Sequence, residues 1–196
     1  LYFTNEDGIV EFDLLNNKVI NKSKDFTRRN VFAEVNNTIY AINGRGVIKK
    51  NKLNQWVDIL KFNWVPTGFM IFDIKQENAQ ELFVATTDGV YKYNIEKNTF
   101  KFLYRDKAKV NFRSIFKMDE YFLFGTYGGG VYMYKQGAIK KIPFDPKSYL
   151  KFAHCFIEDD EHNIWATTNK GLFRSPKQSV KDFWNFGPGK IAFRYF

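Results

Sequence analysis

Five copies of one short motif recur along the chain, and this repetition constrains the fold more than any other feature. The copies begin at Leu1, Ile39, Leu82, Leu123 and Ile164. Each copy has a glycine seven residues after its first residue, and these glycines are Gly8, Gly46, Gly89, Gly130 and Gly171. The steps between them are therefore 38, 43, 41 and 41 residues. A four-stranded propeller blade has a period of about 40 to 45 residues, so the repeat predicts a series of similar small sheets.

The chemistry of the repeat predicts strands that are covered on both faces. Each copy starts with an aliphatic residue followed by an aromatic one, as in Leu82-Phe83 and Ile164-Trp165, and two apolar residues follow each glycine. Adjacent residues of a strand point to opposite faces, so each sheet is expected to lie between two like sheets. No segment shows helical periodicity. We therefore expect an all-β chain, a β-propeller built of four-stranded antiparallel blades.

Turn residues divide the chain into about five blades. The predicted blades cover residues 1–29, 30–66, 67–108, 109–149 and 150–196. The first copy starts at its second strand, and the fifth trails into residues 176–196. The five repeats are therefore expected to form an arc of a larger ring rather than a closed one.

The positions of individual strands follow from the turns. In the fourth blade, tight turns at Asp119-Glu120, Gly128-Gly129 and Gln136-Gly137 predict strands over 111–116, 121–125, 130–134 and 138–142. The same division predicts inner strands over 30–35, 69–74 and 152–157.

The composition fits a folded domain and argues against several kinds of site. The 196 residues are 44% hydrophobic and 26% charged, with no apolar run long enough to span a bilayer. The chain begins at Leu1, so we expect a piece of a longer protein whose membrane segments lie outside it. The single Cys155 and two histidines argue against a disulfide framework and a zinc site. No cofactor or metal is therefore expected, and no recognised catalytic motif is present, so this region is not expected to be an enzyme.

The fifth repeat resembles the two-component regulator propeller repeat. That pattern has an acidic pair, a turn ending in Asn or Gly, an aliphatic-Trp pair, Thr, and then Gly-Leu-aromatic. It matches Asp159, Asp160, Asn163, Ile164, Trp165, Thr167, Gly171, Leu172 and Phe173. The other four copies fit more loosely, with Tyr or Phe in place of Trp. The segment from Lys181 also resembles the passage that follows the last repeat in such sensors.

The resemblance implies a fold, a location and a function. It implies a seven-bladed ring in the periplasmic, ligand-sensing region of a membrane-bound hybrid histidine kinase. It also implies a homodimer formed through the full-length sensor and an oligosaccharide ligand, acidic sugars included, that controls polysaccharide utilisation.

Loops on one face of the predicted propeller carry the candidate binding residues. The loops that enter each inner strand and those between second and third strands open on the same face, and they hold basic, aromatic and amide side chains. Sugars need aromatic rings for stacking and polar groups for their hydroxyls, and acidic sugars also need Arg or Lys. The candidate ligand-binding residues are Arg28, Arg29, Arg45, Trp64, Lys109, Arg113, Tyr127, Lys151 and His154.

Arg113 and His154 stand out among these residues. The corresponding positions of the second and third blades hold the apolar Phe32 and Ile71. The two polar groups are expected either to line a polar central tunnel or to be paired within the core by hydrogen bonds.

Other functions are weaker alternatives. The net charge of +9 favours an acidic partner, but lysines are spread over all repeats, so no nucleic-acid partner is expected. Asp159, Asp160 and Glu161 could hold calcium, although acidic residues are also typical of such a turn. A protein-binding scaffold is the main alternative to a sugar sensor, and an enzyme that uses the same face is a second.

Overall fold

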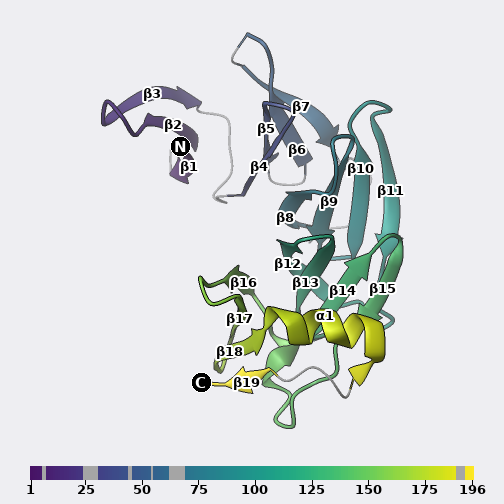
Figure 1. Cartoon of the computed structure of the whole chain (residues 1–196). Helices are drawn as coiled ribbons and strands as arrows, with labels where there is room; N and C mark the ends of the chain where they lie inside the picture. The colour runs from purple at the N-terminus through teal and green to yellow at the C-terminus, as the bar shows by residue number, and fades with distance from the viewer. Residues whose placement is uncertain (6–7, 24–30, 44–45, 54, 62–68, 189–192) are drawn as a thin grey trace. The chain divides into compact units, whose positions relative to one another are not determined.

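The computed structural model describes residues 1–5, 8–23, 31–43, 46–53, 55–61, 69–188 and 193–196. The described chain consists of five antiparallel sheets in chain order, each built of sequential strands (Figure 1). The first sheet has three strands, as expected for a copy that starts at its second strand. The other four sheets have four strands each. These are the predicted propeller blades, and the fold class is confirmed.

Each sheet is formed by strands that are consecutive in the chain. The first sheet contains β1 (Tyr2–Asn5), β2 (Gly8–Asp13) and β3 (Lys18–Ser23). The second contains β4 (Phe32–Val35), β5 (Thr38–Asn43), β6 (Gly46–Lys50) and β7 (Trp56–Lys61). The third contains β8 (Ile71–Gln76), β9 (Glu81–Thr86), β10 (Val90–Asn94) and β11 (Thr99–Tyr104). The fourth contains β12 (Asn111–Met118), β13 (Tyr121–Tyr127), β14 (Val131–Lys135) and β15 (Ala138–Lys141). The fifth contains β16 (Cys155–Glu158), β17 (Asn163–Thr168), β18 (Gly171–Pro176) and β19 (Arg194–Tyr195).

Threonine and glycine of the repeat close the turn between the second and third strands. Thr86 Oγ1 donates to the carbonyl of Gly89 at 2.9 Å, and Thr126 Oγ1 does the same to Gly130 at 2.8 Å. Gly89 has φ +150°, and a Cβ there would lie 2.3 Å from the carbonyl oxygen of Tyr104. At this copy of the repeat, glycine is therefore required both by its backbone conformation and by the close approach of the outer strand.

The described chain divides into two compact units. The first unit comprises Leu1–Val84 with Lys92–Lys101, and the second comprises Ala85–Tyr91 with Phe102–Phe196. In the first unit the inner strand β4 contacts the next inner strand, β8. In the second unit β12 contacts β16 in the same way. Contact between successive inner strands is the arrangement that propeller blades require.

A core between the fourth and fifth sheets includes a helix that the periodicity analysis did not predict. Helix α1 (Lys177–Phe186) follows β18 directly (Figure 1), and it precedes the short outer strand β19. Its Val180 and Phe183 are buried in this core, and the Trp184 ring lies 5.9 Å from that of Tyr121. The expectation of no helix was therefore wrong. The spacing of Val180, Phe183 and Trp184 is helical, but three residues are too few to dominate a periodicity analysis.

The described residues include no helix that is long and apolar enough to cross a membrane.

Candidate functional site

Five of the nine predicted binding residues lie in the second compact unit. They are Lys109, Arg113, Tyr127, Lys151 and His154. The other four, Arg28, Arg29, Arg45 and Trp64, fall in 24–30, 44–45 and 62–68, outside the described residues.

The β13–β14 turn is tied to the segment that enters β16. The backbone N–H groups of Gly128 and Gly130 both donate to the carbonyl of Lys151, at 2.8 and 3.1 Å. Tyr127, the last residue of β13, forms an isolated antiparallel bridge with Phe152. These contacts bring two loops of neighbouring sheets together, as predicted for loops that open on one face.

Arg113, Tyr127 and His154 meet at this junction. The Arg113 guanidinium lies 5.4 Å from the centroid of the Tyr127 ring, and the His154 ring centroid lies 6.0 Å from it. His154 Nε2 lies 2.5 Å from Oδ1 of Asn169, which belongs to the β17–β18 turn. Tyr127 is 46% exposed, whereas Arg113 and His154 are half-buried. The four side chains form a row, which we call the Tyr127 row, that runs from β12 to the β17–β18 turn.

The local backbone explains why Arg113 and His154 leave the apolar pattern of their column. Arg113 lies at a register shift of β12, between Phe112 and Ser114. A bulge of this kind re-aims a side chain. The backbone N–H of His154 donates to the carbonyl of Thr167 at 2.9 Å, just before β16 begins. Both side chains reach Tyr127, and the sequence did not predict this contact.

Phe144 is a second aromatic residue beside this junction that the sequence analysis missed. It lies in the loop after β15, and its ring has the Lys141 ammonium at 5.0 Å and the Lys151 ammonium at 5.1 Å. A Cβ on Gly130 would lie 2.6 Å from the same ring. Phe144 does not occupy any of the positions that recur in the repeat. An aromatic residue that lies in a loop and has no packing role in the repeat is the sequence signal that could have identified it.

Polar contacts hold the neighbouring loop in place. The Tyr132 hydroxyl donates to Asp106 Oδ2 at 2.5 Å, and Lys141 Nζ lies 3.8 Å from the same oxygen. Burial, and next the hydrogen bond to Asp106, raise the pKa of Tyr132, so the hydroxyl stays protonated and donates. Lys109 lies in the same loop with φ +52° and an exposed side chain. Among the described contacts, its side chain does not join the Tyr127 row.

The acidic cluster considered for calcium is used within its own turn. Asp159 Oδ1 accepts backbone hydrogen bonds from Glu161 and Asn163 at 3.0 and 2.8 Å. Its Oδ2 accepts the indole N–H of Trp165 at 2.6 Å. The hydrogen bond from Trp165, with those from Asn163, lowers the pKa of Asp159 to about 2. In the described part of the chain no three His, Cys, Asp or Glu side chains are grouped to hold a metal ion.

Comparison with known proteins identifies solved structures that have a similar fold. No known family is matched by the sequence, and no curated relative is found. Solved structures match well: the extracellular domain of BT4673 from B. thetaiotaomicron, described as a hybrid two-component system, superposes with a TM-score of 0.72 at 17% identity. The match covers 88% of this chain and 24% of that one.

A second extracellular domain from the same organism extends the comparison. That of BT3049, also described as a hybrid two-component system, gives a TM-score of 0.60 at 11% identity and covers 85% of this chain and 24% of that one. The chain therefore spans about a quarter of the length of these neighbours. Identities this low show a fold shared with these two extracellular domains.

Proposed function

We propose that this chain is part of the ligand-sensing propeller of a hybrid two-component sensor histidine kinase. In this proposal the propeller lies on the periplasmic side of the inner membrane and binds an oligosaccharide, acidic ones included. Binding then controls polysaccharide utilisation. The observation that carries the proposal is the Tyr127 row, in which an exposed aromatic ring is flanked by a guanidinium, an imidazole and an amide. No catalytic step is proposed for this region.

The chemistry of the row suits a sugar. A pyranose ring has an apolar face that stacks on an aromatic ring, and Tyr127 presents such a ring at its exposed edge. Arg113 and Asn169 supply donors and an acceptor in fixed positions for hydroxyl groups. Phe144, with Lys141 and Lys151 against its ring, adds a second aromatic surface with two positive charges. A carboxylate or sulfate on the sugar would be held by these ammonium groups.

Signalling would follow from differential binding. A ligand that binds one arrangement of the sensor better than another shifts the population toward that arrangement. In the proposed full-length homodimer the shift would pass to the kinase through segments outside this chain. The likeness to extracellular domains of hybrid two-component systems supports this role.

The test is a binding measurement on the chain together with its flanking sequence in the natural protein. Thermal shift is measured against neutral, uronic-acid and sulfated oligosaccharides, because a ligand that binds the native state raises the melting temperature. Tyr127→Ala is expected to weaken binding about tenfold, the scale of one lost stacking contact with its hydrogen bonds. Arg113→Gln is expected to weaken the binding of acidic sugars more than the binding of neutral sugars.

Phe186→Ala is the matched control, because Phe186 is an aromatic residue that is 72% exposed at the end of α1. It should leave the affinity unchanged. If no glycan shifts the melting temperature of a cooperatively unfolding protein, the proposal fails and a protein-binding scaffold becomes the better interpretation. Equal affinity in wild type and Tyr127→Ala would remove the row from the binding site.

A further inference from the structure

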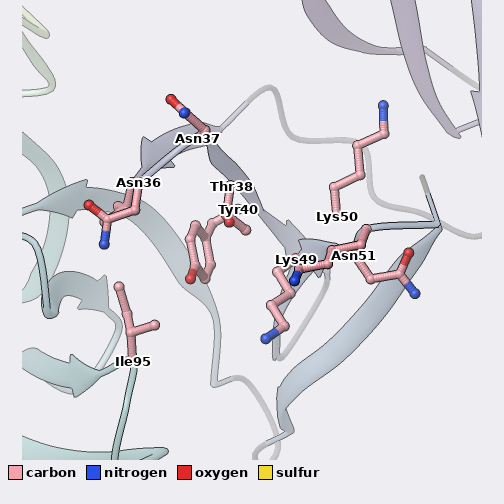
Figure 2. A pocket seen from close by; sticks show the side chains of 10 residues that line it. Asn36, Asn37, Thr38, Tyr40, Lys49, Lys50, Asn51 and Ile95 are labelled. Carbon is pink, nitrogen blue, oxygen red and sulfur yellow. The ribbon is translucent and has the colours of Figure 1, made fainter.

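A cavity of about 390 Å³ lies in the first compact unit, far along the chain from the Tyr127 row. It is formed at the β4–β5 turn and at the end of β6, which is the opposite end of the second sheet from its β5–β6 turn. Figure 2 shows Tyr40, Lys49, Asn36 and Ile95 around it. A volume of this size is at the small end of the range for small-molecule sites, roughly 300 to 1,000 Å³.

The strand register places the polar groups of the cavity on one face. Tyr40 of β5 and Lys49 of β6 are directly opposite partners. Thr38 and Asn51 follow at two-residue spacing on the same side. Lys50 points to the opposite side of β6 (Figure 2), where its ammonium lies 2.5 Å from Glu11 and 3.1 Å from the Tyr2 hydroxyl. The alternation of the strand therefore gives Lys50 a carboxylate partner and leaves Lys49 on the cavity side.

Hydrogen bonds from the side chains of two lining asparagines and from the backbone hold the walls in place. Asn36, which has φ +49°, donates from Nδ2 to the carbonyl of Ala79 at 2.8 Å. Asn51 Oδ1 accepts the backbone N–H groups of Leu53 and Gln55, both at 2.9 Å. The Ile95 N–H donates to the carbonyl of Gln80 at 2.8 Å. The cavity is thus formed before any ligand arrives, and the loss of conformational freedom on binding is reduced.

The charge of the lining is positive. The ten lining residues include Lys49, Lys50 and Lys52 and no aspartate or glutamate. Glu11 pairs with Lys50, and among the described residues neither Lys49 nor Lys52 has an ion-pair partner. Tyr40 is 3% exposed, and its burial raises the pKa of its hydroxyl, which therefore remains a donor at neutral pH. Amide groups, two hydroxyls and the apolar side chains of Val35 and Ile95 complete the lining.

From this geometry we infer that the cavity binds a small anion that carries hydroxyl groups, a sugar acid or a sugar phosphate, with Lys49 as its charge partner and Tyr40 as a hydrogen-bond donor. The site is separate from the Tyr127 row, and the inference does not depend on the proposed sensor function.

Calorimetric titration of the full chain with four probes tests the inference. The probes are glucuronate, glucose 6-phosphate, glucose and inorganic sulfate. Glucuronate or glucose 6-phosphate is expected to bind at least tenfold more tightly than glucose, and the tighter of the two identifies carboxylate or phosphate as the anionic group. Sulfate is expected to bind more weakly than that ligand, because it lacks the hydroxyl groups. The affinity should fall as salt is raised, because the contact is between charges at the protein surface.

Substitutions in the cavity test which side chains bind the anion. Lys49→Gln is expected to lower the affinity about tenfold, which corresponds to the loss of one charge-assisted hydrogen bond. Tyr40→Phe removes only the hydroxyl and should weaken binding several-fold. The matched control is Lys75→Gln, since Lys75 is an exposed strand lysine of the same unit that does not line the cavity. Melting temperatures of all variants establish that they are folded.

Some results would overturn the inference. The first is that neither sugar anion binds at millimolar concentration. The second is that glucose binds as tightly as the two sugar anions, and the third is that a folded Lys49→Gln variant keeps the affinity of the wild type. Arg113→Gln and Tyr127→Ala should leave this titration unchanged, so failure here and failure of the proposed sensor site are distinguishable.

Discussion

The fourth and fifth sheets are built on the same repeat, yet their first turns are held in different ways. In the fifth sheet Asp159 accepts hydrogen bonds from its own turn and from the Trp165 indole of the next strand. The position of Trp165 is taken in the fourth sheet by Phe124, which has no N–H to donate. The first turn of the fourth sheet is held by ion pairs instead: Glu120 contacts Lys135 Nζ of the same sheet at 3.2 Å, and Asp119 is contacted from outside the sheet.

Those contacts come from helix α1. Asp119, in the first turn of the fourth sheet, accepts Lys177 Nζ at 2.8 Å and pairs with Lys181 Nζ at 2.5 Å. Lys177 also contacts both oxygens of Glu158 in the fifth sheet, each at 3.0 Å. The helix thus joins the two sheets through charge as well as through its buried face. The comparison shows that the repeat specifies a blade, whereas the length of the first turn and the residues in and beside it decide how that turn is held.

The largest effect is expected from removing the buried face of the helix. Phe183 is 4% exposed within the core between the two sheets. Phe183→Ala should lower the free energy of unfolding by about 3 to 5 kcal/mol, because it leaves a cavity and removes apolar contacts. Thermal and denaturant unfolding followed by circular dichroism measure this loss. Phe186→Ala at the exposed end of the same helix should change stability by less than about 0.5 kcal/mol. Similar losses in the two variants would mean that α1 does not hold the sheets.

A smaller effect is expected from the internal brace of the fifth sheet. Trp165→Phe should lower the melting temperature by about 2 to 4 °C at neutral pH, the shift that the loss of one hydrogen bond produces in a chain of this size. The pKa of Asp159 is about 2 against an ordinary 3.8, so the native state favours the carboxylate. The contribution of Asp159 is therefore full above about pH 3.8 and is lost as the pH falls through about 2.

The difference between wild type and Trp165→Phe should follow the same pH course. Asp159→Asn should remove this pH dependence, and Asp160→Asn, an exposed neighbour in the same turn, is the control. A difference that persists unchanged down to pH 2 would show that Trp165 contributes by packing rather than through the carboxylate.

The smallest effect is expected from the outer charge pair of the fourth sheet. Lys181→Gln should lower the free energy of unfolding by about 0.5 kcal/mol, because the pair is partly exposed. The loss should disappear in high salt, which screens exposed charges. Lys107→Gln, at an exposed lysine in the loop before β12, serves as the control. Equal effects of the two variants, or an effect independent of salt, would contradict a role for the Lys181–Asp119 pair.

Much of the fold could be predicted from the repeat. The third strand of the fourth blade, predicted over 130–134, is Val131–Lys135, and the outer strand, predicted over 138–142, is Ala138–Lys141. Strand positions follow from local turn chemistry and alternation, both of which are written in adjacent residues. Helix α1 was missed because its apolar face has only three residues and its stability comes from packing between two sheets.

The candidate site was predictable only in part. Arg113 and His154 were identifiable because they interrupt an apolar column, and Tyr127 because it lies at a turn. Their meeting at one ring depends on a register shift in β12 and on contacts between residues 14 and 27 positions apart in the chain. Phe144, outside the repeat, gave no periodic signal at all.

By itself the sequence determined the number of repeats, the order of the strands and the residues that form the two faces of each sheet. These depend on spacing and alternation, which act between neighbours in the chain. Only the tertiary structure decided which polar groups are used for bracing and which remain for a ligand. Lys49 and Lys50 are adjacent and chemically identical, yet the ammonium of Lys50 pairs with Glu11 whereas that of Lys49 lies on the cavity side, because the strand turns them to opposite faces with different neighbours.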